Sequence, residues 1–163
     1  MDDHTESPGK STTTAVVTGA EAFGWPITLR RTLANLTSVT SAVDNLTAEL
    51  SKPHTLVAVH LDAALDRATS VLSYAIAWSV SDELQIIDVA THPAYLRQGH
   101  ARTVMRSLFA HAKSNGSRIA LLEVRESNKE AQALYSAFGF EQTRKRSSYY
   151  HNGDDALELQ LVL

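Results

Sequence analysis

The chain has 163 residues, of which 44% are hydrophobic and 20% are charged, and this composition is typical of one globular domain with a substantial core. It contains no cysteine, which excludes disulfide bonds, thiolate metal ligands and a thiol nucleophile and is compatible with the cytoplasm. The net charge of -3 gives no general reason to expect nucleic acid as a partner, and no apolar run reaches the ~18–20 residues that a membrane-spanning helix needs. The histidines are scattered without ligand-like spacing, so we expect no metal site. We therefore expect a cytoplasmic protein with no direct nucleic-acid or membrane partner.

The N-terminal third predicts a short leader, a strand and a helical segment. Residues 1–11 are polar and acidic without a hydrophobic stretch, so we expect a disordered leader rather than a secretory signal, followed by a single domain over residues 12–163. Residues 12–18 are rich in β-branched side chains and predict a strand. Leucine and valine recur at three- and four-residue steps over residues 20–50, which predicts one or two helices behind an irregular aromatic turn at residues 23–26.

The middle of the chain predicts three strands followed by a helix. Residues 55–61, 71–80 and 84–90 have the composition of strands, with a turn region at residues 62–69 between the first two. Apolar residues then recur at helical spacing over residues 99–114. The last of these strands therefore runs through a short loop into a helix that begins at a glycine.

The loop before this helix is a candidate anion-binding site. Gly99 has no Cβ, so the backbone there can approach a ligand closely and adopt angles that other residues resist. The start of a helix presents unpaired N–H groups and the positive end of the helix dipole, which suits a phosphate or pyrophosphate. A structural turn is the commoner use of a single glycine, so the loop needs support from the rest of the sequence.

The remainder of the chain predicts a strand, a helix and two further strands. Residues 119–124 form a nearly continuous apolar run, as expected of a strand covered on both faces. Ser127 and Glu130 have the spacing of a capping box, and the helix that follows ends at Gly139. Residues 141–149 and 156–163 predict two strands. This order of elements predicts an α/β fold of the α+β type, with a mixed sheet and helices on its faces.

Two residues in this part of the chain suggest acid–base chemistry. Glu123 places a carboxylate in an otherwise apolar strand, which is costly unless the group is paired, exposed at an opening or functional; a solvent-facing charge at a strand end is the alternative. Tyr135 lies on the apolar stripe of the following helix, where a tyrosine is most often a core residue. Together they offer a carboxylate that can accept a proton and a phenol that can donate one.

Other polar residues nearby have a structural interpretation beside a functional one. Asn128 at the helix start is either a cap or a ligand contact, and its position favours the cap. The basic run at residues 144–146 is typical of an edge strand whose charges oppose aggregation. Tyr149 and Tyr150 are adjacent on a predicted strand and so point to opposite faces, and at least one of them should reach solvent or a site.

The second half of the chain, from about residue 84 to residue 163, resembles the GNAT acetyltransferase superfamily, whose signature is R/Q-x-x-G-x-G/A at a strand-to-helix loop. The corresponding segment is LRQGHA at residues 96–101, which departs from the signature at Leu96 and carries His100 where an apolar residue is usual. The likeness extends to RimI-type N-terminal acetyltransferases, which share six short motifs with this sequence in the same order. These motifs are L-E-V-R at residues 122–125, S-N at 127–128, A-L-Y at 133–135, G-F at 139–140, Y-Y at 149–150 and D-A at 155–156. So many elements in one order make the resemblance specific, unlike the glycine loop alone.

The resemblance implies a mixed, mostly antiparallel sheet flanked by helices, with acetyl-CoA as co-substrate and no metal. Glu123 is expected to remove the proton of the acceptor amine and Tyr135 to protonate the departing CoA thiolate, by direct transfer in a ternary complex. The pyrophosphate is expected on the loop and the helix start. The residues expected to bind acetyl-CoA are Val89, Ala90, Thr91, Arg97, Gln98, Gly99, His100, Ala101, Arg102 and Asn128. The acceptor is expected beside Trp25, Tyr149 and Tyr150.

The acceptor implied by the resemblance is the α-amine of a protein or peptide, and the RimI-type likeness points to a ribosomal protein. A GNAT enzyme acting on lysine side chains or on a small amine has the same core, but a double tyrosine fits a narrow slot for a peptide backbone better than an open groove. A non-catalytic CoA-binding module is a further alternative, against which the intact pair of Glu123 and Tyr135 argues.

Overall fold

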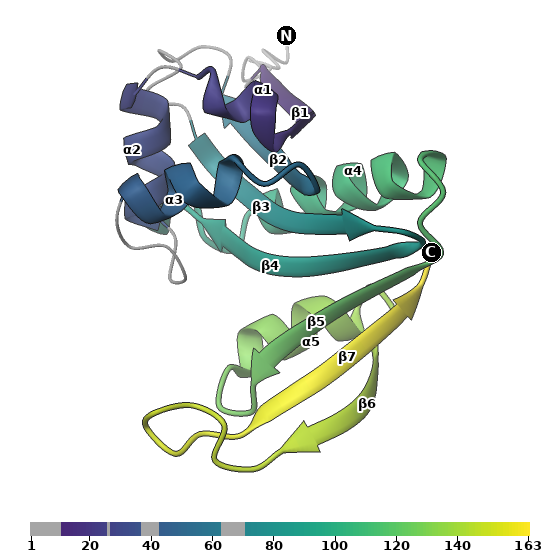
Figure 1. Cartoon of the computed structure of the whole chain (residues 1–163). Helices are drawn as coiled ribbons and strands as arrows, with labels where there is room; N and C mark the ends of the chain where they lie inside the picture. The colour runs from purple at the N-terminus through teal and green to yellow at the C-terminus, as the bar shows by residue number, and fades with distance from the viewer. Residues whose placement is uncertain (1–10, 26, 37–42, 63–70) are drawn as a thin grey trace, which may run out of the picture.

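A seven-stranded sheet forms the centre of the computed structural model, which describes residues 11–25, 27–36, 43–62 and 71–163 (Figure 1). The spatial order is β1-β2-β3-β4-β5-β7-β6, and all neighbouring strands are antiparallel except β4 and β5, which are parallel. The strands are β1 (Thr12–Thr18), β2 (Thr55–Asp62), β3 (Val71–Val80), β4 (Glu83–Thr91), β5 (Ile119–Arg125), β6 (Glu141–Arg146) and β7 (Ala156–Val162). The described helices are α1 (Gly19–Phe23), α2 (Ile27–Leu36), α3 (Val43–Leu50), α4 (His100–Ser114) and α5 (Lys129–Ser136), with a single 3-10 turn at Pro93–Tyr95. The predicted fold class, a mixed and mostly antiparallel sheet with helices on its faces, is confirmed.

The strands lie close to their predicted positions, and the largest difference is at the end of β6. This strand ends at Arg146 instead of Tyr149, because Ser148 has a φ of 50°, which lies outside the β region. The predicted leader and the predicted turn at residues 62–69 lie outside the described residues, apart from Ser11 and from Asp62, which ends β2.

Three short helices follow β1, where one or two helices behind an aromatic turn were predicted. The first of them, α1, begins with a capping box: the Thr18 hydroxyl accepts from the N–H of Glu21 (3.3 Å), and the Glu21 carboxylate accepts from the N–H of Thr18 (2.8 Å). Phe23 is therefore the last residue of a helix rather than part of a turn. Pro26, the end of the predicted turn, lies outside the described residues.

Two hydrophobic clusters cover the two faces of the sheet. Helices α1–α3 pack on one face through buried side chains such as Leu33 and Leu50. Helices α4 and α5 lie on the other face, where Met105, Leu108 and Tyr135 belong to the second cluster (Figure 1). Strands β4 and β5 contribute to this second cluster through residues such as Ile86 and Leu122.

The side chains of β5 alternate between buried and exposed, which corrects the prediction of a strand covered on both faces. Leu122 and Val124 pack into the cluster beneath α4 and α5, whereas Glu123 and Arg125 are exposed on the opposite face. The cluster formed by α1–α3 contains no residue of β5, so the described helices cover only one face of this strand. The carboxylate of Glu123 is therefore at an opening in the sheet and not in a core.

Strands β4 and β5 separate after a short paired region. They are hydrogen-bonded only as far as Ile86 and Leu122, and a β-bulge against β3 leaves Ile87 as an extra residue in β4. A bulge bends the strand that carries it. Beyond the bulge β4 continues to Thr91 and β5 to Arg125, and the two strands diverge (Figure 1). This divergence makes room for the site.

Candidate active site

Two cavities lie along the diverging strands. The first, of about 950 Å³, is lined by the end of β4, the loop before α4, the first turn of α4 and most of α5, and we call it the glycine-loop cavity. The second, of about 760 Å³, is lined by β4, β5, α5 and residues 149–151, and we call it the Glu123 cavity. Val89, Asn128, Ala131 and Tyr135 line both cavities, so the two spaces meet at these residues.

The glycine-loop cavity has the features of an anion-binding site. Gly99, with a φ of 84°, is the N-cap of α4, and no side chain caps the helix, which leaves its first N–H groups available. A Cβ built on Gly99 would have no heavy atom within 4 Å, so the space in front of the loop is open. Arg97 and Arg102 add two guanidinium groups to the lining. Backbone N–H groups at a helix start together with arginine suit a pyrophosphate, so the residues present fit acetyl-CoA.

The residues expected to bind acetyl-CoA all line this cavity except Gln98, which is exposed in the loop. Asn128 also caps α5, because its Oδ1 accepts from the N–H of Ala131 (3.0 Å). The predicted capping box at Ser127 and Glu130 is therefore wrong: the cap lies one residue later, and the Ser127 hydroxyl donates to the Asp154 carboxylate instead.

His100, the first residue of α4, links this cavity to the buried face of β2. Its ring centroid lies 5.2 Å from that of His60 and 6.2 Å from that of Tyr95. Burial, and then the nearby His100, lower the pKa of His60, whose Nδ1 lies 2.7 Å from the hydroxyl oxygen of Thr14. A neutral His60 allows the two rings to lie side by side without repulsion between like charges.

Glu123 reaches the second cavity from the open face of β5. Its Oε1 lies 2.9 Å from Nη1 of Arg146, and the same nitrogen lies 3.7 Å from Oε1 of Glu158. The Glu123 side chain is 32% exposed, so the carboxylate remains accessible from the cavity. An accessible carboxylate at the wall of a cavity can accept a proton from a bound group.

Tyr135 stands where the two cavities meet. Its ring packs against Phe140 with centroids 5.7 Å apart, and the residue is only 8% exposed. Burial, and then the charge of Asp88, raise the pKa of Tyr135 to about 12, so the phenol stays protonated near neutral pH. Its hydroxyl has no hydrogen-bond partner in the part of the chain that the structure describes. The group can therefore donate a proton towards either cavity.

Tyr149 and Tyr150 line the Glu123 cavity from the loop between β6 and β7, and their predicted place on a strand is wrong. Because the chain has left β6, the two side chains do not point to opposite faces; their rings form a T-shaped contact with centroids 5.1 Å apart. An arginine guanidinium also lies over each ring. The guanidinium carbon of Arg146 is 3.9 Å from the ring centroid of Tyr149, and that of Arg125 is 3.6 Å from the ring centroid of Tyr150. Burial raises the pKa of Tyr150, so its hydroxyl also stays protonated.

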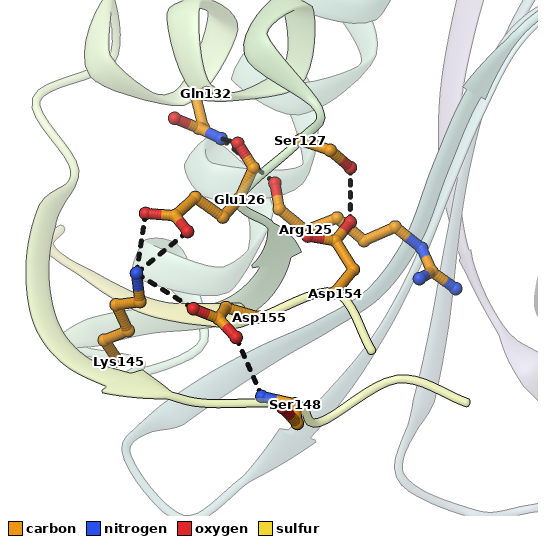
Figure 2. A network of polar contacts seen from close by, with 8 residues as sticks. All are labelled: Arg125, Glu126, Ser127, Gln132, Lys145, Ser148, Asp154 and Asp155. Carbon is orange, nitrogen blue, oxygen red and sulfur yellow. Dashed lines mark hydrogen bonds and ion pairs between the residues drawn. The ribbon is translucent and has the colours of Figure 1, made fainter. Parts of the chain in front are cut away.

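An ion-pair network holds the loop that carries these tyrosines (Figure 2). Lys145 Nζ lies 2.9 and 2.8 Å from the two carboxylate oxygens of Glu126 and 2.9 Å from the carboxylate of Asp155. Asp155 in turn accepts from the N–H of Ser148 (2.7 Å). The hydrogen bonds to Glu126 and Asp155 raise the pKa of Lys145 to about 12, and the N–H of Ser148, followed by Lys145, lowers the pKa of Asp155. The contacts therefore favour the charged forms of both groups.

The turn between β5 and α5 forms the other side of this network. The Gln132 amide donates to the carbonyl oxygens of Arg125 (3.0 Å) and Glu126 (2.7 Å), and Ser127 bonds to Asp154 across the gap (Figure 2). The tyrosine loop is thus anchored to the same turn that begins α5, the helix of Tyr135.

The residues that support the site in this way were not predicted. The basic run at residues 144–146 was interpreted as an edge-strand cluster, yet Arg146 pairs with Glu123 of the cavity and Lys145 pairs with Glu126 at the end of β5. Their partners, Glu126 and Glu123, are separated from them by 19 and 23 residues in the sequence. The spacing of neighbouring residues along the sequence cannot predict contacts between residues that are this far apart in the chain.

Trp25 is not brought to either cavity. Its side chain is partly buried against the cluster formed by α1–α3. Within the described residues, the linings of both cavities begin no earlier in the chain than Gln85. The geometry therefore supplies no contact that would support Trp25 as a substrate-binding residue.

The residues that the structure describes include neither a membrane-spanning helix nor a cluster of metal ligands. No helix there is long and apolar enough to cross a bilayer, and no group of three or more His, Asp or Glu side chains is placed to hold a metal ion.

Known proteins resemble this chain in sequence over about two thirds of its length. A protein from Haemophilus ducreyi named ribosomal protein bS18-alanine N-acetyltransferase is 30% identical over 106 residues, which cover 65% of this chain and 73% of that protein. The protein of the same name from Escherichia coli strain K12 is 34% identical over 107 residues, covering 64% of this chain and 72% of the relative.

Solved structures share the fold. The crystal structure of the ribosomal-protein-S18-alanine N-acetyltransferase from Escherichia coli matches with a TM-score of 0.76 at 22% identity, over 93% of this chain and 94% of that one. Arabidopsis thaliana NAA60 in complex with acetyl-CoA matches with a TM-score of 0.76 at 11% identity, over 94% and 99% of the two chains. The model of the acetyltransferase (GNAT) family matches residues 32–140, about two thirds of the sequence. The resemblance in the motifs is thereby confirmed, and the chain belongs to the GNAT family of acetyltransferases.

Proposed function

We propose that this acetyltransferase transfers an acetyl group from acetyl-CoA to the α-amine of a protein, in the manner of RimI-type enzymes. The observation that carries the proposal is the meeting of the two cavities at Tyr135, with an anion-binding loop on one side and Glu123 on the other. The bS18-alanine N-acetyltransferase relatives favour a ribosomal protein as the acceptor. Since such an acceptor is made in the cytoplasm, we place the enzyme there and treat residues 12–163 as its single catalytic domain.

The glycine-loop cavity would hold acetyl-CoA, which supplies the acetyl group as a reactive thioester. The N–H groups at the start of α4, together with Arg97 and Arg102, face the space that a pyrophosphate needs. The unpaired side of β4 at Val89–Thr91 supplies backbone groups that can orient the rest of the molecule and polarise the thioester carbonyl.

Proton transfer falls to Glu123 and Tyr135. An α-amine has a reference pKa of about 7.7–8.0, so a fraction is neutral at pH 7, and Glu123 would take the proton that the nitrogen loses as its bond to the acetyl carbon forms. The Tyr135 hydroxyl, protonated because its pKa is raised to about 12, would give a proton to the sulfur as the carbon–sulfur bond breaks. Because the chain has no cysteine, a ternary complex with direct attack fits better than a thioester on the enzyme.

A peptide acceptor is favoured by the walls of the Glu123 cavity. Tyr149 and Tyr150 lie next to the carboxylate and are anchored by the network around Lys145, which gives a defined slot rather than an open groove. A lysine side chain or a small amine remains the second candidate, and a CoA-binding module without activity is the third. Both proton-transfer candidates face a cavity, which supports an enzyme over the module.

Acetyl transfer to a matched pair of peptides tests the proposal. One peptide carries a free Ala N-terminus and one internal lysine, and the other has the same sequence with a blocked N-terminus. We expect acetylation of the first peptide at its α-amine and none of the second, located by mass spectrometry. The released CoA thiol can be followed continuously with a thiol reagent, because the enzyme contains no cysteine to react with it.

The blocked peptide also serves as the control that separates the candidates. Preferential acetylation of its lysine would contradict the α-amine proposal and leave a lysine acetyltransferase. Binding of CoA without transfer to any amine would leave the CoA-binding module.

A further inference from the structure

Arg146, on β6, contacts two residues that line the Glu123 cavity, although β7 lies between its strand and β5. Its Nη1 lies 2.9 Å from Glu123 and 3.7 Å from Glu158, and its guanidinium carbon lies 3.9 Å from the ring centroid of Tyr149. Arg146 is the last residue of β6, paired in register with Ala156 of β7. One side chain thus touches the candidate base, a second carboxylate and a wall of the slot.

The sheet register explains why a cation is needed at this point. Glu123 of β5 and Glu158 of β7 are directly opposite one another in the antiparallel pair. Like charges in that position repel each other, and Arg146 is the cation that lies against both. With Arg146 the three side chains carry one net negative charge, and without it the two carboxylates carry two. Arg125, on the same face of β5, adds a second guanidinium to the cavity wall.

We propose that Arg146 is a specificity-determining residue that prevents the Glu123 cavity from holding amines with a second positive charge close to the reacting one. Two neighbouring carboxylates without a cation between them form a suitable site for a second ammonium group. Arg146 occupies that place, so diamines and peptides that begin with Lys or Arg lose this interaction. The inference rests on the proposed function, and it adds that the first residue of the acceptor has an uncharged side chain.

Two peptides that differ only in Met or Lys at the first position test this role, because the two side chains have similar length and differ in charge. We expect the wild-type enzyme to have a kcat/KM about tenfold higher for the Met peptide. In Arg146→Met the ratio should fall by about three- to tenfold, and 1,4-diaminobutane should become a better acceptor. Arg146→Lys keeps the positive charge and should restore the preference.

Arg144→Met is the matched control, since Arg144 lies on the same strand and is exposed; it is the register partner of Glu158 in β7 but makes no ion pair with a described residue. This variant should keep the wild-type ratio of kcat/KM between the Met and Lys peptides.

Added salt gives a second measurement that does not depend on any variant. Because the Arg146 side chain is 38% exposed, raising NaCl from about 0.05 to about 0.5 M should weaken the wild-type preference.

A wild-type ratio in Arg146→Met overturns the inference, as does an equal fall in Arg144→Met. A thermal shift with CoA shows that each variant is folded. If Arg146→Met does not fold, Arg146→Lys and the salt series test the inference instead. Loss of the preference for the Met peptide in Arg146→Lys overturns the inference, and so does a wild-type preference that is constant across salt. Failure of the wild-type enzyme to acetylate any free N-terminus is a separate outcome, which contradicts the proposed function and this inference with it.

Discussion

The groups expected to bind ligand in the glycine-loop cavity are mainly backbone groups, whereas those in the Glu123 cavity are charged and aromatic side chains from β5, α5 and the loop at residues 149–151. In the first, the key groups are the helix start at Gly99 and the free side of β4. In the second, Glu123 and Tyr149 are held by Arg146. A backbone site persists through many side-chain changes and suits a constant ligand, while a side-chain site can be altered residue by residue and suits a variable acceptor. This difference predicts that substitutions in one cavity leave binding in the other largely unchanged.

Glu123→Gln should have the largest effect on turnover. The amide keeps the shape of the side chain and removes the proton acceptor, so we expect kcat to fall about 10²–10⁴-fold. Binding of acetyl-CoA, measured by isothermal titration, should not change, because Glu123 lines only the other cavity. Glu141→Gln, an exposed carboxylate on β6, is the control and should be active. A Glu123→Gln enzyme with normal turnover would show that another group, or an already neutral amine, makes this carboxylate dispensable.

Tyr135→Phe should lower kcat about 10²-fold with little effect on stability, because it removes a hydroxyl that has no partner among the described residues. Tyr74→Phe is the instructive comparison: its hydroxyl donates to Asp88 at 2.5 Å in the core, so its loss should cost about 1–3 kcal/mol of stability instead. Thermal unfolding and steady-state rates distinguish the two effects. The opposite pattern, with stability lost and turnover kept in Tyr135→Phe, would make Tyr135 a core residue.

The pH profile of the wild-type enzyme follows from the same residue. Since the pKa of Tyr135 is raised to about 12, the phenol keeps its proton below that pH, and activity should not decline near pH 10, where an ordinary tyrosine ionises. The rate should instead rise as the α-amine loses its proton near pH 8 and then stay level to about pH 10. A fall between pH 9 and about 10 would contradict the role of Tyr135 as the acid.

Gly99→Trp should abolish CoA binding and leave the fold intact. A Cβ at this position meets no atom within 4 Å, so a large side chain fills the open space in front of the loop, with added strain from the φ of 84°. For the wild-type enzyme, CoA at about 100 times its Kd should stabilise the native state by about 2.7 kcal/mol, a shift in Tm of roughly 5–10 °C. The variant should show no such shift. A Gly99→Trp protein that CoA still stabilises would contradict the pyrophosphate site.

Lys145→Met should have the smallest effect and change only the acceptor side. Lys145 joins Glu126 to Asp155 and so holds the loop that carries the tyrosines (Figure 2). Because these ion pairs are exposed, we expect no more than a two- to fivefold rise (roughly) in the peptide KM, with acetyl-CoA binding unchanged. Arg144→Met, next to it on β6, should have a normal KM. An equal loss of acetyl-CoA binding would mean that the two cavities are not separable.

The parts of the molecule that were predictable are those whose signals are local. The strand before Gly99 and the helix after it follow from composition, periodicity and a single glycine. Glu123 drew attention as a carboxylate in an apolar strand, whereas Tyr135 looked like a core residue and was singled out only beside Glu123 and through the family resemblance. The tyrosine loop was misplaced, because the positive φ of Ser148 has no marker in a serine. The role of Arg146 depends on strand register, which no spacing along the chain specifies. The first failure is a local backbone angle that the residue type does not indicate, and the second is a contact between residues far apart in the sequence.

The separation of β4 from β5 has a consequence for solubility. Beyond Ile86 no described strand pairs with the inner side of β4, so its backbone N–H and C=O groups form an unpaired edge in the middle of the sheet. Unpaired edges on the outside of proteins invite pairing with other chains, and one of the two outer edges here, β6, is short and polar. The inner edge of β4 instead lies within the two cavities, between β4, β5 and α5, and not along the outside of the sheet. Backbone groups that would invite a second chain on an outer edge are thus placed where acetyl-CoA and the acceptor are proposed to bind.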